Sequence, residues 1–379
     1  MSLSIFWLLP TGGDSRYLGK ASAFRPISNA YLRQIATTAE QFGYDGLLIP
    51  TGSWNLDPFV TAATLAAVTS RIKLLVALRT SAVGNPTVFA RATATLDEAL
   101  NGRLILNVVP GAYEKELAAE GIRLSHDERY ELADEFLTLW KRLLNGERVT
   151  HKGKYFDIED AQNLFPPVQK PHPPLYFGGS SDAAHDLTAK HIDAYLSWGE
   201  PPHLVAEKIA DVKKRAEKYG RKVRFGLRVN VIVRDTNEEA WAEANKLISH
   251  IDDETIAKAQ RNFALIDSVG QKRLTSLHNG DKNKLEVSPN LWAGIGLVRR
   301  GAGTALVGDP KTVAARLQEY IDLGIDTFVL SGYPHLEEVS RFAELVFPLL
   351  PDKKPTSVPN DKIFAESVFS SHFENKEAV

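Results

Sequence analysis

The stretch "GLRVNVIVR" at residues 226–234 shows how strands are used in this chain. Successive side chains of a strand point to opposite faces, so its leucine and three valines share one face while Arg228 and Asn230 share the other. An antiparallel sheet with one face in water would accept this pattern, but a parallel strand covered on both faces is usually apolar throughout. The stretch alone leaves two interpretations open: a solvent-facing side or a functional site.

The rest of the chain repeats one pattern: an amphipathic helix, a short turn of Gly, Asn or Asp, and an apolar run typical of a strand. Alternating strands and helices indicate parallel βα units, and a count of eight favours a closed (β/α)8 TIM barrel of the α/β class over an open doubly wound sheet. Arg228 and Asn230 are then expected on the inward face near the carboxyl ends of the strands, where such barrels build active sites. The eight expected strands lie in "MSLSIFWLLP" (1–10), "LLIP" (47–50), "IKLLVAL" (72–78), "LILNVV" (104–109), "PPLYFGG" (173–179), "DAYLSW" (193–198), "GLRVNVIVR" (226–234) and "TFVLSG" (327–332).

Three segments fall outside this repeat. We expect one barrel domain over residues 1–350, with insertions at about 147–172 and 250–307 and a polar tail at 351–379 that is mobile or packs on a partner subunit. The first insertion carries an "HKGKY" turn between two β-like runs, which predicts a hairpin. The second insertion is a polar helix followed by a connection too long for an ordinary loop, and long loops are usually lids or disordered segments.

Composition restricts the function. The 379 residues carry a formal net charge of -2, which gives no nucleic-acid or membrane footprint and favours small-molecule partners. The chain has no cysteine, so disulfides, thiolate metal sites and cysteine nucleophiles are excluded, and no metal site is predicted. The apolar start lacks a basic region and reaches Pro10 too early for a signal peptide or a membrane span, so we expect a cytoplasmic protein.

Two motifs suggest an anion site. In "LYFGGSSDAAHDL" (175–187) a strand, two glycines, two serines and a helix follow one another, and free N–H groups at a helix start beside serine hydroxyls suit a phosphate; an ordinary turn with a serine cap is the alternative. In "SHDERYE" (125–131), His126 and Tyr130 share a helix face, either as part of a phosphate site or as a core pair. By contrast, "GAGTALVG" (301–308) lacks the third glycine of a dinucleotide loop and is interpreted as a flexible hinge before a helix capped by Asp309.

A second group of polar residues follows strands or lies in the long insertion. Arg299 is in "GLVRRGAG", while Tyr333 and His335 follow the last strand in "SGYPHLEE". Together with Arg228 they could surround an anion, with Trp198 of "SWGEP" as a wall. The alternatives are a solvated surface arginine and a histidine that only begins a helix.

The chain resembles the bacterial luciferase-like superfamily and, within it, the two-component alkanesulfonate monooxygenases. The segments that carry the resemblance span about residues 1–350: "FWLLPTGGD", "LIPTG", "KLLVALR", "NPTVFARATATLDEALNGR", "PPLYFGGSS", "WGEPP", "SPNLWAGIGLVRRGAGTALVGD" and "IDTFVLSGYPHLEE". The resemblance implies a (β/α)8 barrel that takes reduced FMN from a separate NAD(P)H:FMN reductase and uses O2 to split the C–S bond of a sulfonate into sulfite and an aldehyde. A homodimer or homotetramer is expected.

The resemblance also assigns residues. It places Asn107, His126, Tyr130, Gly178, Gly179, Ser180 and Ser181 at the FMN. It places Trp198, Arg228, Asn230, Arg299, Tyr333 and His335 at the substrate, with Arg228, Arg299, Tyr333 and His335 as catalytic residues. A sulfonate stays anionic at cellular pH and offers three acceptor oxygens, which suits arginine.

The chain departs from this family at the predicted mouth. Close relatives carry His, Cys and His where Asn230, Asn55 and Gly12 stand here. An amide both donates and accepts, which suits hydroxyl groups, so a sulfonated sugar resembling sulfoquinovose is kept beside simple alkanesulfonates. Two further hypotheses remain: a deazaflavin-dependent dehydrogenase of the same superfamily, and a flavin- or anion-binding protein without turnover.

Overall fold

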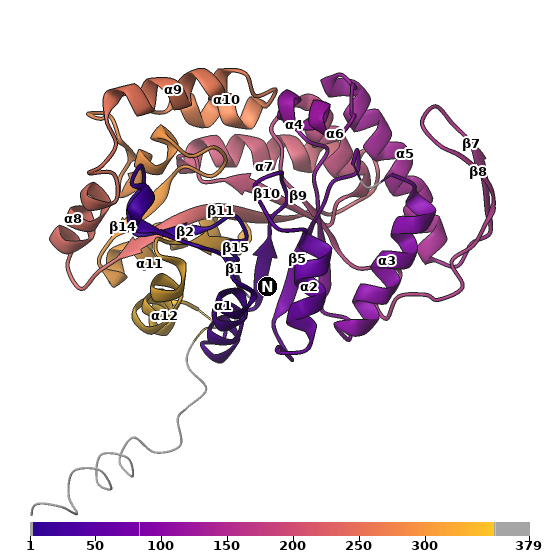
Figure 1. The fold of residues 1–379 in the computed structure, drawn as a ribbon, viewed down its shortest axis with the longest axis horizontal. Helices are drawn as coiled ribbons and strands as arrows, with labels where there is room; N and C mark the ends of the chain where they lie inside the picture. Colours follow the sequence, from indigo (N-terminus) through magenta and orange to yellow (C-terminus); the bar gives the residue numbers. More distant parts are fainter. Residues whose placement is uncertain (1–2, 83, 352, 354–379) are drawn as a thin grey trace, which may run out of the picture.

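A closed barrel of eight parallel strands forms the centre of the molecule (Figure 1). The computed structural model describes residues 3–82, 84–351 and 353. Neighbouring strands pair in the order β10-β9-β6-β5-β4-β1-β15-β11, and a β10–β11 pairing closes the ring. The predicted α/β TIM barrel is confirmed, and each strand overlaps one of the eight predicted stretches, with β4, β11 and β15 beginning one or two residues earlier than predicted. The strands are β1 (Ser4–Leu8), β4 (Gly46–Ile49), β5 (Lys73–Leu78), β6 (Leu104–Val108), β9 (Leu175–Phe177), β10 (Ala194–Trp198), β11 (Arg224–Val233) and β15 (Ile325–Ser331).

Helices connect the strands and cover the outside of the barrel. Many begin with a side chain that accepts a hydrogen bond from the first turn, such as Ser28, Ser125 and Ser181, or with a cap followed by proline. The predicted cap Asp309, with Pro310 after it, does begin a helix. The barrel helices are α1 (Asn29–Gln41), α2 (Pro58–Ala66), α3 (Pro86–Ala99), α4 (Glu114–Ala119), α5 (His126–Leu144), α6 (Asp182–His191), α7 (Pro202–Glu217), α8 (Asn237–Leu247), α11 (Pro310–Asp322) and α12 (His335–Val346).

The opening stretch becomes β11, and its two faces have different surroundings. The leucine and valines pack in the apolar layer between the strands and the helices. Arg228 pairs in register with Val329, which belongs to the small apolar cluster inside the barrel together with Phe6 and Tyr176. The predicted inward position of Arg228 and Asn230 is therefore confirmed.

The long insertion forms helices and short strands of its own. It contains α9 (Asp253–Ala264), α10 (Val269–Ser276), β12 (Glu286–Ser288), β13 (Leu291–Trp292), a 3-10 helix η2 (Gly294–Leu297) and β14 (Ala305–Gly308). The interpretation of residues 301–308 as a flexible hinge is wrong over its second half, because β14 pairs with Asn230–Val233 of β11. β10 ends opposite Arg228, so the later half of β11 has a free edge that β14 occupies.

The first insertion forms the predicted antiparallel hairpin of β7 (Val149–Lys152) and β8 (Asp157–Ala161), which projects beside α5 (Figure 1). Among the described residues, no helix is both long and apolar enough to cross a membrane. The predicted tail beyond residue 353 lies outside the described residues. The remaining short elements are β2 (Asp14–Ser15), β3 (Phe24–Arg25), η1 (Ala21–Ala23) and η3 (Phe347–Leu349).

Candidate active site

Two adjoining cavities lie at the carboxyl ends of the barrel strands. The smaller has a volume of about 260 Å³ and is called the serine cavity, after Ser180 and Ser181 in its wall. The larger has a volume of about 720 Å³ and is called the arginine cavity, after Arg79, Arg228, Arg299 and Arg300 in its wall. Trp198 and Arg228 line both cavities, so a molecule in one can meet a molecule in the other at these side chains.

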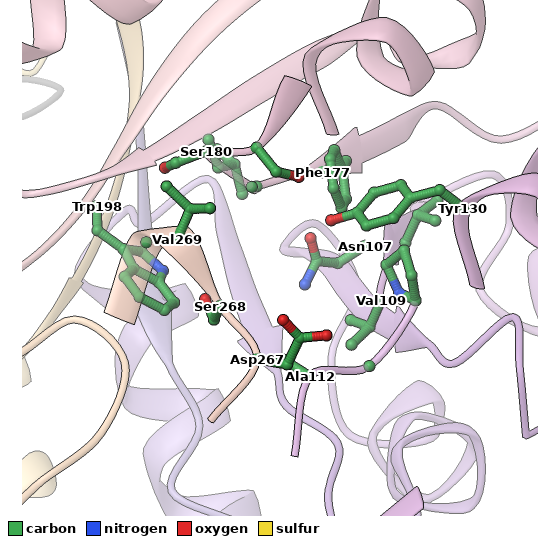
Figure 2. A pocket seen from close by; sticks show the side chains of 18 of the residues that line it. Asn107, Val109, Ala112, Tyr130, Phe177, Ser180, Trp198, Asp267, Ser268 and Val269 are labelled. Atoms are coloured by element: carbon green, nitrogen blue, oxygen red, sulfur yellow. The ribbon is translucent and has the colours of Figure 1, made fainter. Parts of the chain in front are cut away.

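The serine cavity brings together all of the predicted cofactor residues (Figure 2). Asn107 comes from β6, and the rings of His126 and Tyr130 lie 4.8 Å apart at the start of α5. Ser180 and Ser181 connect β9 to α6, where the Ser181 hydroxyl accepts a hydrogen bond from the Ala184 N–H at 3.3 Å. Burial raises the pKa of Tyr130, so its phenol remains a neutral donor. These residues give the cavity one polar end beside a helix start.

Two glycines shape this cavity. A Cβ atom on Gly178 would lie 2.5 Å from the Leu196 carbonyl oxygen, so close packing of β9 on β10 requires glycine there. A Cβ atom on Gly270 would lie 3.3 Å from the Trp198 ring and 3.5 Å from the Ser180 hydroxyl oxygen. Both glycines line the cavity, so a larger side chain at position 270 would narrow the space between Trp198 and Ser180.

Arg228 stands at the boundary of the two cavities, and its hydrogen-bond partners are neutral. Its Nη1 atom donates to the Ser331 hydroxyl at 2.9 Å and to the Val229 and Val329 carbonyl oxygens at 3.3 Å each. Within the described ranges, no carboxylate forms an ion pair with Arg228, Arg299 or Arg300. Burial lowers the pKa of Arg228 to about 10, which leaves the guanidinium charged at neutral pH. A half-buried cation that lines a cavity without a counterion is incompletely solvated, so this position favours an anionic ligand.

His335 and Tyr333 stand near this cation. His335 lines the arginine cavity and is 1% exposed, with an Nδ1 atom that has no hydrogen-bond partner among the described residues. Burial, helped by the charges of Arg228 and Arg299, lowers the pKa of His335 to about 3, so the imidazole is neutral. Tyr333 is not among the described residues that line either cavity; its ring lies 5.3 Å from the His335 ring and 5.7 Å from the Arg299 guanidinium.

Asn230, which was predicted at the substrate, is not among the described residues that line either cavity. The residue is 2% exposed. Its Nδ2 atom donates to the Ala302 and Thr304 carbonyl oxygens at 2.8 Å each, and its Oδ1 atom accepts from the Ser331 hydroxyl. Both amide donors and the amide oxygen are therefore used to join β11 to the segment before β14 and to β15.

The sequence did not predict one part of the wall of the serine cavity, which comes from the start of α10. Asp267, Ser268, Val269 and Gly270 line the serine cavity, and Figure 2 shows Asp267 opposite Asn107. Asp267 accepts from Arg129 at 2.8 Å.

Two ion pairs anchor α10: Arg129 with Asp267, and Arg273 with Glu200 at 2.6 Å. Glu200 is fully buried beside Lys208. Arg129 and Asp267 are 138 residues apart in the sequence, and Arg273 and Glu200 are 73 residues apart. No local sequence signal could therefore have paired them.

Comparison with known proteins gives one family and several related folds. Residues 3–327 match the family described as luciferase-like monooxygenase. A riboflavin lyase solved with modified FMN and riboflavin is 21% identical with a TM-score of 0.76, covering 92% of this chain and 91% of its own. A long-chain alkane monooxygenase, LadA, is 22% identical with a TM-score of 0.75 and the same coverage.

DmoA from Hyphomicrobium sulfonivorans is also 22% identical with a TM-score of 0.75, and the match covers 92% of this chain and 88% of DmoA. At these identities the three structures share the barrel fold with this chain.

Proposed function

Because the chain belongs to the luciferase-like monooxygenase family, we propose that it uses reduced FMN and O2 to cleave the C–S bond of an organosulfonate. The products would be sulfite and an aldehyde, and a separate NAD(P)H:FMN reductase would supply the reduced flavin. The observation that carries the proposal is Arg228: a half-buried cation whose hydrogen-bond partners are all neutral, placed where the two cavities meet.

The serine cavity fits a flavin mononucleotide in its chemistry. The first backbone N–H groups of α6, the hydroxyls of Ser180 and Ser181 and the side chains of Tyr130 and His126 would hold the phosphate. Asn107 and the apolar wall would face the ring system, and Gly270 leaves room beside Trp198. The riboflavin lyase of similar fold contains a modified FMN, which supports this choice. When bound, reduced flavin supplies the electrons that activate O2.

The arginine cavity would hold the substrate with its sulfonate at Arg228. A sulfonate has three acceptor oxygens, and arginine can meet them with charge-assisted hydrogen bonds while keeping its own charge. Because Arg228 lines both cavities, an anion bound there places the adjoining carbon beside the flavin cavity. Neutral His335 adds a polar group with a free nitrogen at the same end of the cavity. Arg299, which is exposed, would complete the anion site from the insertion.

Access of water to the site would be limited by α10. Its anchors, Arg129 with Asp267 and Arg273 with Glu200, hold the insertion over the serine cavity. Excluding water strengthens the electrostatic interactions inside the site and suppresses side reactions of reduced flavin with solvent. Holding this wall in place is therefore part of the proposed activity.

Simple alkanesulfonates are favoured over a sulfonated sugar by one observation. Asn230 was the main reason to expect a hydroxylated substrate, and its hydrogen bonds are made within the protein. The deazaflavin-dependent dehydrogenase stays an alternative because it shares the barrel fold.

The test is sulfite release by the purified protein with a flavin reductase, FMN, NAD(P)H and air, comparing octanesulfonate, methanesulfonate and sulfoquinovose. Sulfite that requires both FMN and O2 supports the proposal, and no sulfite from a broad sulfonate panel rejects it. Preferential binding of a deazaflavin over FMN would favour the dehydrogenase instead.

A further inference from the structure

A second set of hydrogen-bond donors lies in the arginine cavity, on a different wall from Arg228. Arg299 and Arg300 are neighbours in the chain but contact different aromatic rings. The Arg299 guanidinium lies 5.7 Å from the Tyr333 ring centre, on the side of Arg228 and His335. The Arg300 guanidinium lies 3.1 Å from the Trp54 ring centre and 5.0 Å from that of Tyr113. The two arginines therefore face two separate parts of one cavity.

The wall around Arg300, called the Trp54 wall, consists of Trp54, Arg79, Tyr113 and Arg300. Arg79 is 6% exposed, and its Nη1 atom pairs with Glu116 at 2.9 Å and Glu120 at 2.8 Å. Its Nε and Nη2 atoms are buried and have no hydrogen-bond partner among the described residues. Buried donors of this kind are costly when left unmatched, so they point to a ligand that accepts.

Two acceptors near this wall already have donors within the protein. The Glu116 Oε1 atom accepts from Arg79 and from the Ser53 N–H. The Asn55 amide oxygen accepts from the Thr11 hydroxyl at 3.1 Å, and its Nδ2 atom donates to the Thr51 carbonyl oxygen at 3.2 Å. Among the described residues, the groups of this wall without a partner are donors. They are the Nε and Nη2 atoms of Arg79 and the N–H groups at the edge of the Arg300 guanidinium, while the Trp54 ring covers the face of that guanidinium. A hydroxyl would bring its own donor, whereas a carboxylate or sulfonate only accepts.

We infer that the Trp54 wall is a second anion subsite, and that the substrate is an organosulfonate with a carboxylate or a second sulfonate at its far end. The identity of the reacting end rests on the proposed function, and the second anion rests on the Trp54 wall itself. One anion would lie at Arg228 and the other at Arg300 and Arg79, with the carbon chain between them in the cavity of about 720 Å³. Arg228, Arg299 and Arg300 line the cavity without an ion-pair partner among the described residues, whereas the charge of Arg79 is balanced by Glu116 and Glu120. The excess of positive charge comes from the first three arginines, and it favours a dianion.

The test compares binding of matched ligands by calorimetry to protein loaded with oxidised FMN, so that no turnover occurs. Alkanesulfonates of two to eight carbons are measured beside ω-sulfocarboxylates and ω-disulfonates of the same chain length, at about 0.15 M salt to screen distant charges. At the best chain length we expect the dianion to bind at least about tenfold more tightly than the monoanion, since one charge-assisted hydrogen-bonded contact is worth that much. The carboxylate and disulfonate series show which second group is preferred.

The variant Arg300→Ala is expected to reduce the ratio of dianion to monoanion affinity to near one, and Arg300→Lys to retain part of it. Arg261→Ala, which removes an exposed arginine from α9, is the matched control and should keep the full ratio. Equal affinity for the two series in the unaltered protein, or a dianion preference that survives Arg300→Ala, would overturn the inference.

Sulfite release is measured on the same ligands to separate the two claims. A dianion preference without any sulfite would support the subsite and reject C–S cleavage. Sulfite release from monoanions and dianions alike, with no difference in affinity, would support the proposed function and reject the subsite.

Discussion

The position of Arg228 at the barrel mouth could be predicted from sequence, because it depends only on the residues of its own strand. Strict alternation in β11 places it on the inward face, and the end of the strand places it at the mouth of the barrel. Asn230, two residues later on the same face, was also expected at the substrate, but it lines neither cavity. Its partners are backbone carbonyls more than 70 residues away, and no pattern within β11 indicates them. Side-chain direction was therefore predictable, but hydrogen-bond partners were not.

The variant Arg228→Ala should lower sulfonate kcat/KM much more than FMN affinity. A hydrogen bond to a charged group contributes about 1.5–3 kcal/mol, so the expected loss in kcat/KM is roughly tenfold to 150-fold. FMN affinity, measured by fluorescence quenching, should change by less than about threefold, because the proposed phosphate contacts lie at the other residues of the serine cavity. Equal losses in both measurements would assign Arg228 to the flavin or to the fold.

At the scale of elements, the barrel strands were predictable and the insertion was not. Each barrel strand carries its own apolar run and a turn before it, whereas β14 lies in a glycine-rich stretch typical of a loop. It forms a strand by pairing with two partners that are distant in sequence: β13, and the end of β11 that extends beyond β10. The packing of α10 on the cavity likewise depends on ion pairs between residues distant in sequence.

The variant Arg273→Gln should loosen α10 without unfolding the barrel. Glu200 is fully buried and would keep Lys208 as its partner, so the loss of stability should be less than the about 3–5 kcal/mol typical of breaking a buried pair. Hydrogen exchange followed by mass spectrometry should show faster exchange in residues 253–276. The control is Arg261→Gln on the exposed face of α9. Unchanged exchange in the Arg273 variant would show that this ion pair does not hold the segment.

At the scale of the whole molecule, the count of eight βα units was enough to predict a closed barrel, because the connection rules for parallel strands leave few alternatives.

The response of stability to pH is also a property of the whole molecule, because it sums over all buried histidines. Burial lowers the pKa of five histidines below the usual value: His172, His185, His191, His278 and His335. Below about pH 6.5 these groups therefore bind fewer protons in the folded chain than in the unfolded chain.

The free energy of unfolding should therefore fall as pH falls from about 6.5 to about 5, before most carboxylates titrate. His335, whose pKa is lowered to about 3, contributes a slope that approaches about 1.4 kcal/mol per pH unit well below pH 6.5, and the other four histidines add to it in the same direction. Urea unfolding of His335→Gln should show a shallower slope than the unaltered protein, whereas His203→Gln, an exposed residue of α7, should keep it. An identical slope in the His335 variant would mean that this imidazole is protonated in the folded protein.

The most direct test of the account is a single turnover. The protein is mixed without oxygen with one equivalent of chemically reduced FMN and an excess of a sulfonate, and air-saturated buffer is then added. If the adjoining cavities hold flavin and sulfonate as proposed, sulfite should approach one equivalent per flavin, with matching aldehyde. The account would be contradicted if the flavin were fully reoxidised and produced hydrogen peroxide but no sulfite with all of the sulfonates and disulfonates named above.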